Sequence, residues 1–120
     1  SVYGVEAQIP NPVEDTGGPL TVKTLTDGDV DAADIPTCSP AITDDDLVVL
    51  EDPAGLILPE NVTPLVRRDL AVGAAQAIDA VSARLSLDEL RALNARSTGE
   101  QLDSATIASG WLEAQGLIHG

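Results

Sequence analysis

The side chains in this sequence that could do chemistry are mainly carboxylates, together with one thiol. Asp27, Asp29 and Asp31 alternate like the first ligands of an EF-hand calcium loop. The sixth and twelfth positions of that loop would be Ala32 and Cys38, where the turn glycine and the bidentate glutamate belong. The spacing therefore predicts no calcium site.

Nucleophilic catalysis would need a base beside the nucleophile. Cys38 has no such base close in the sequence, because the single histidine, His119, lies in the terminal tail. The sequence holds no Gly-x-Ser-x-Gly elbow, phosphate-binding loop or metal-spaced histidine set. No pair of carboxylates stands in a context that would shift one pKa. We therefore expect no enzyme, no catalytic residue, no metal and no cofactor.

Composition limits the partners of the chain. Its 120 residues are 43% apolar, so a core is possible, and that core must be aliphatic because Phe and Met are absent. The net charge of -14 repels the phosphates of nucleic acids. A single cysteine excludes an internal disulfide, and no run of 18 apolar residues is long enough to span a membrane.

The chain up to Arg67 predicts strands around one short helix. Pro19 suits the first position of that helix, and Gly28 fits the residue just past its end. Apolar runs bounded by charges, glycines or prolines are typical of strands. Such segments occupy residues 5–9, 30–35, 47–50 and 62–66.

After Arg67 the pattern predicts three consecutive helices. Ser86 and Glu89 form a capping-box pair for the second, and Asp103 suits the N-cap of the third. Gly116 fits a Schellman ending of the third helix. One apolar face of the first helix carries Leu70, Ala74, Ala77, Ile78 and Val81.

The order of these elements predicts an α/β fold with a helical closing segment. The first half offers few helices to cover a sheet, and the chain starts abruptly at Ser1. We therefore expect the chain to be a portion of a longer protein, with part of its core supplied by residues outside it. The alternative is a self-associating or partner-binding module, because an incomplete sheet needs a partner.

Several segments, in order and nearly from end to end, are similar to one family of transport proteins. They resemble the osmoprotectant-type substrate-binding proteins of bacterial ABC importers, which capture glycine betaine, choline or carnitine. The segments that carry the resemblance are Gly17–Leu25, Asp27–Asp34, Pro40–Ile42, Asp46–Asp52, Asn61–Val62, Pro64–Arg68, Ser82–Leu85, Leu87–Leu90, Leu93–Ala95, Trp111–Leu112 and Gly116–Leu117.

The resemblance implies the C-terminal part of a type II periplasmic-binding-protein fold, in which two α/β lobes hold the ligand in a cleft. Residues 1–58 would then belong to the second lobe, and residues 59–67 would cross the hinge. Residues 68–120 would return as helices to the first lobe. The expected partners are a small solute, an ABC permease, and either the missing N-terminal part or a second copy.

The resemblance also places the site. Aromatic faces hold quaternary ammonium groups, and two positions that commonly carry such aromatics in this family are Pro36 and Glu60 here. Glu60 would offer a carboxylate to a cationic or hydroxyl-rich solute, or would be a solvated hinge residue. Thr37 and Asn61 would hydrogen-bond the solute, or would serve backbone turns.

These inferences converge on a non-catalytic function. We expect a solute-binding component that captures an osmoprotectant-like solute in an interlobe cleft and delivers it to a permease. We expect it outside the cytoplasm, periplasmic or at the cell surface, either without a lipid anchor or with one on an N-terminus that precedes Ser1.

Overall fold

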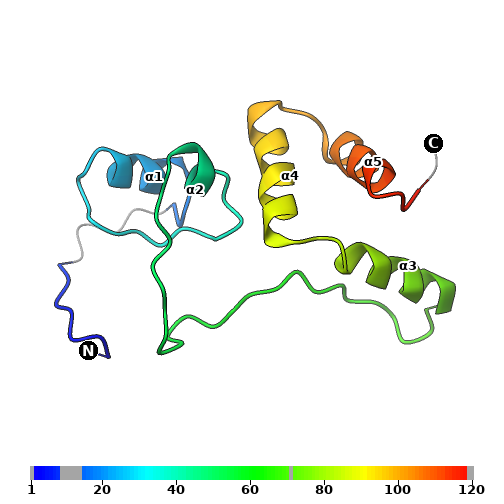
Figure 1. Ribbon diagram of the computed structural model, residues 1–120, viewed down its shortest axis with the longest axis horizontal. Coiled ribbons are helices and arrows are strands. Elements are labelled where there is room, and N and C mark those ends of the chain that lie inside the picture. Colours follow the sequence, from blue (N-terminus) through cyan, green and yellow to red (C-terminus); the bar gives the residue numbers. More distant parts are fainter. Residues whose placement is uncertain (1, 9–14, 71, 119–120) are drawn as a thin grey trace. The chain divides into compact units, whose positions relative to one another are not determined.

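A computed structural model describes residues 2–8, 15–70 and 72–118 of the chain (Figure 1). The chain divides into two compact units, Ser1–Pro59 and Glu60–Gly120.

The described residues of the first unit form the helices α1 (Pro19–Thr26) and α2 (Ala41–Asp44). Pro19 stands at the start of α1, as predicted, and the N-cap residue Gly18 has no side chain to accept a hydrogen bond. Asp15 takes that role, because its Oδ2 accepts the N–H of Leu20 at 2.6 Å. The Asp15 carbonyl also accepts the N–H of Gly18 at 3.0 Å. Asp15 therefore satisfies two amides at the start of α1.

The C-terminus of α1 is a Schellman motif centred on Gly28. This glycine has φ +79°, a conformation that side chains disfavour. Its N–H donates to the Leu25 carbonyl at 3.1 Å, and the Asp29 N–H donates to the Thr24 carbonyl at 3.0 Å. The predicted helix stop at Gly28 is therefore confirmed.

The second unit contains α3 (Val72–Ser82), α4 (Leu87–Gly99) and α5 (Ser104–Ala114). The three helices that the sequence predicts after Arg67 are confirmed, but Leu70, predicted on the apolar face of the first, lies before the start of α3. The Ser86 hydroxyl accepts the Glu89 N–H at 3.2 Å, and an Asp103 carboxylate oxygen accepts the Thr106 N–H at 3.0 Å.

The buried side chains of the described residues lie on α5, where it packs against α4. Ile107 is 5% exposed and Trp111 is 8% exposed. The Trp111 indole N–H donates to the Glu89 carboxylate of α4. The predicted capping box is therefore only half correct. The Ser86 side chain caps α4, but the Glu89 side chain binds Trp111 and does not accept the Ser86 N–H. That N–H donates instead to the Arg84 carbonyl at 3.0 Å.

The structure corrects the predicted strands. None of the described residues lies in a strand, including those of segments 5–8, 30–35, 47–50 and 62–66; Ile9, the end of the first segment, lies outside the described residues. A strand exists only when a neighbouring strand takes up its N–H and C=O groups. These segments have no such neighbour among the described residues, so the α/β sheet is not seen.

Much apolar surface is left uncovered as a result. The chain exposes 9595 Å², whereas two compact monomers of half its mass would together expose about 7,400 Å². Val48, Leu50 and Leu65 are 84%, 76% and 95% exposed. Most apolar side chains of the segments 47–50 and 62–66, which the sequence predicts as strands, are therefore exposed to solvent.

Candidate functional site: four predicted contacts and an apolar hollow

Pro36 and Thr37 lie in a turn of the first unit that reaches the start of α1. The turn is closed by the Ser39 N–H, which donates to the Pro36 carbonyl at 2.8 Å. A methyl group added to Gly17 would come within 2.2 Å of Pro36 Cδ, so the two residues are in close contact. Gly17 also has φ +69°. The predicted contact residue Pro36 therefore packs against Gly17, Thr37 follows it in the same turn, and both are exposed.

Glu60 and Asn61 begin the second unit and are exposed. The Asn61 carbonyl accepts a hydrogen bond from the Thr63 hydroxyl at 3.4 Å. The four predicted site residues are therefore divided into two pairs, one in each unit. Their contact with a solute stays a prediction.

A hydrogen-bonded loop follows the segment 47–50. The Tyr3 hydroxyl donates to Asp52 Oδ1, and the same hydroxyl accepts the Ala54 N–H at 2.8 Å. Asp52 Oδ2 accepts the Ile57 N–H at 2.9 Å. The hydrogen bonds from Ile57 and Tyr3 stabilise the carboxylate and lower the pKa of Asp52. Tyr3 and Asp52 therefore tie the segment near the N-terminus to this loop.

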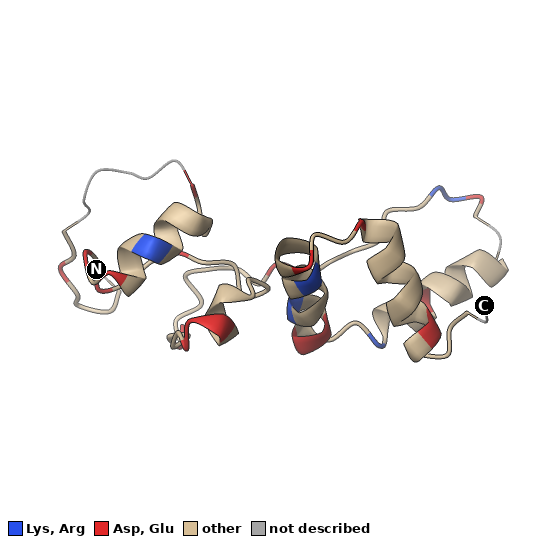
Figure 2. Cartoon of the chain, turned by 90° about the horizontal axis from the view of Figure 1, so that it is seen from above, with Lys and Arg blue, Asp and Glu red and all other residues tan. Residues whose placement is uncertain are grey.

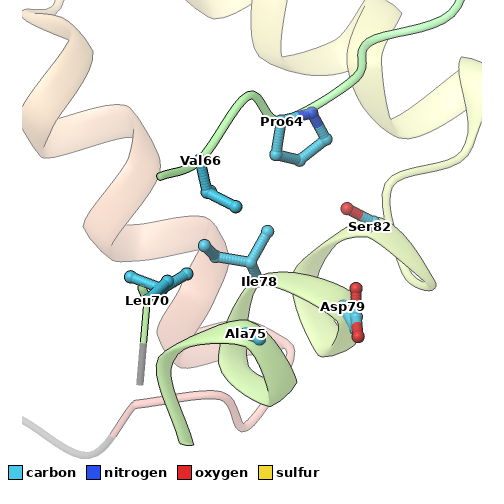
Figure 3. A pocket seen from close by; sticks show the side chains of 7 residues that line it. All are labelled: Pro64, Val66, Leu70, Ala75, Ile78, Asp79 and Ser82. Carbon is cyan, nitrogen blue, oxygen red and sulfur yellow. The ribbon is translucent and has the colours of Figure 1, made fainter. Parts of the chain in front are cut away.

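A small hollow lies within the second unit, along one side of α3 (Figure 3). Its volume is about 130 Å³, and Val66, Leu70 and Ile78 point toward one another in it. The seven lining residues are Pro64, Val66, Leu70, Ala75, Ile78, Asp79 and Ser82. None of the four predicted site residues is among them, and the hollow has no aromatic wall.

Within the described ranges, no group of three or more His, Cys, Asp and Glu side chains is placed to hold a metal ion. None of the described helices is both long enough and apolar enough to cross a bilayer.

Comparison with known families decides the class of protein. The family described as the substrate-binding domain of the ABC-type glycine betaine transport system matches residues 2–114. The chain belongs to this family. No curated protein and no solved structure matches it.

Membership makes this chain an osmoprotectant substrate-binding domain of an ABC transporter and not an enzyme. The family's members are extracytoplasmic proteins that bind small solutes and interact with ABC permeases. Their fold is of the periplasmic-binding type II class. The resemblance found in the sequence is thereby confirmed.

Sequence reasoning missed three features of these sites. Asp15 carries a usable signal, because an aspartate shortly before a Gly-Gly-Pro helix start is a natural cap. The Tyr3–Asp52 bond joins residues 49 positions apart, and no local pattern encodes such a pair. The hollow on α3 depends on how residues 64–70 return to the helix, which spacing along the chain does not specify.

Proposed function

We propose that the chain captures a small osmoprotectant-like solute, such as glycine betaine or choline, in the cleft between the two lobes of its family's fold. It would then deliver the solute to an ABC permease. The family match over residues 2–114 carries this proposal. In the same scheme residues 1–58 belong to the second lobe, 59–67 form the hinge crossing, and 68–120 return to the first lobe.

The proposed contacts come from the two pairs of predicted residues. Glu60 is exposed and holds a carboxylate that can attract a cationic head group. Thr37 and Asn61 supply polar groups for the rest of the solute. Pro36 replaces an aromatic wall with an apolar one, so recognition here depends more on charge and hydrogen bonding than on a π face.

Titration calorimetry against glycine betaine, choline, carnitine and a polyol tests this function. We expect one-to-one binding of at least one of these solutes. Glu60→Gln should weaken the binding of a cationic solute about two- to fivefold, the range of an exposed ion pair. Glu113→Gln is the matched control, because it removes an exposed carboxylate from α5, a helix that contains none of the proposed contact residues. Silence across the whole panel would reject the proposal.

A second candidate function is self-association or partner binding without ligand capture. The exposed apolar segments at 47–50 and 56–58 favour it, since Val48, Leu50, Ile57 and Leu58 are each at least 75% exposed. Light scattering separates the two functions. A monomer that binds solute supports capture, whereas a solute-blind oligomer supports association.

A further inference from the structure

Charge is divided unevenly between the two units (Figure 2). Residues 1–59 contain twelve acidic residues and one basic residue, Lys23, for a net charge of -11. Residues 60–120 contain eight acidic residues and five arginines, for a net charge of -3. Residues 1–59 therefore carry 11 of the 14 net negative charges of the chain.

Most described carboxylates of the first unit are exposed to solvent, and little positive charge neutralises them. Lys23 forms an ion pair with Asp27, and one ammonium group neutralises only one carboxylate. Asp15 and Asp52 are half-buried and held by backbone N–H groups. The exposed ones are Glu6, Asp27, Asp29, Asp31, Asp34, Asp44, Asp45, Asp46 and Glu51.

Little opposes the mutual repulsion of these groups. Among the described residues of 1–59, no side chain is buried. Leu20 of α1 is 61% exposed, and Val48 and Leu50 are more exposed still. Burial of apolar surface is the main force that favours a compact chain, and this unit has little of it. Electrostatic repulsion, usually a minor influence, therefore decides whether the unit stays compact.

We propose that residues 1–59 require salt at about molar concentration to keep their compact form, because repulsion between charges less than about 10 Å apart is screened only at such concentrations. The Debye length falls from about 10 Å at 0.1 M to about 3 Å at 1 M. Screening of this kind acts on the whole acidic surface and needs no bound ion. The second unit, with its near balance of charge and its buried Trp111, depends far less on salt.

Amide hydrogen exchange on the complete chain tests the proposal. We expect the amides of α1 to gain at least roughly tenfold protection between about 0.1 M and 2 M KCl. The amides of α5 should gain much less. Fluorescence of Trp111, the single tryptophan, reports the second unit in the same samples. Salt-independent protection in α1 would overturn the proposal, as would an equal gain in both units.

A pair of double variants separates screening from other effects of salt. Asp45→Asn with Asp46→Asn removes two exposed charges from the first unit and should reduce the gain in α1 protection. Asn also tolerates the positive φ of Asp46, +52°. The matched control, Asp79→Asn with Glu113→Gln, removes two exposed charges from the second unit and should leave that gain unchanged. An equal effect of the two double variants would contradict the proposal.

The identity of the co-solute gives a last check. NaCl and KCl should act alike, because screening depends on ionic strength. Sucrose, which strengthens burial without carrying charge, should give little protection to α1. A response to only one cation, or equal protection by sucrose, would reject screening as the cause.

Discussion

At the scale of single residues, hydrogen bonds favour the ionised form of the Asp52 carboxylate. It accepts hydrogen bonds from the Tyr3 hydroxyl and the Ile57 N–H. Those bonds, the one from Ile57 first, lower the pKa of Asp52. Partial burial and the bond to Asp52 raise the pKa of Tyr3. The contact therefore favours an ionised Asp52 carboxylate and a protonated Tyr3 hydroxyl.

The Tyr3–Asp52 contact predicts loss of loop order in acid. A lowered pKa in the folded state means that Asp52 stabilises the loop above its unfolded pKa of about 3.9. That contribution disappears as the pH falls through the folded pKa. The Ile57 amide, followed by NMR, should lose its protection in this range. Tyr3→Phe should show weaker protection already at neutral pH. A pH-independent Ile57 amide would contradict this assignment.

At the scale of elements, helix ends are the features that the local sequence determines most directly. The C-terminus of α5 repeats the motif of α1: the Gly116 N–H donates to the Glu113 carbonyl and the Leu117 N–H to the Leu112 carbonyl, both at 2.9 Å. Gly116 has φ +67°. Because these bonds are local, the sequence alone predicts them.

Two glycines of the same helix region should respond oppositely to alanine. Gly116→Ala forces a side chain into the left-handed region and should cost about 1 kcal/mol of unfolding free energy. Gly110→Ala lies inside α5, where its methyl group would meet only Arg96 Nη1 at 3.9 Å. It should stabilise by up to about 1 kcal/mol, through helix propensity. Urea unfolding followed by Trp111 fluorescence measures both, and effects of the same sign would contradict the assignment.

The same reasoning explains where prediction from sequence succeeds and fails. Ser86, Asp103 and Gly116 act on amides within a few residues, so their helices were predicted with their ends. The segments 30–35, 47–50 and 62–66 have the composition of strands but form none. A strand needs a distant partner, and composition does not supply one. For the site, the sequence supplied candidate residues, while their contact with a solute depends on the arrangement of distant segments.

At the scale of the whole molecule, family membership gives these exposed segments a meaning. Within the family's fold, strand-like segments such as 47–50 would find neighbours in a lobe, which accounts for apolar side chains that a self-contained chain would cover. The acidic surface concentrates on residues 1–59, and the predicted contacts Glu60 and Asn61 follow directly after that unit. Solute capture is the function that joins these observations.

Backbone NMR during a titration with glycine betaine tests the proposed solute capture most directly. The titration is carried out in dilute and in concentrated KCl, because we propose that residues 1–59 need salt to stay compact. We predict saturable shifts of the Thr37, Glu60 and Asn61 amides, with α5 amides such as that of Ala108 unchanged as the internal control. Shifts confined to residues around the hollow on α3, or no saturable shift at any residue, would contradict it.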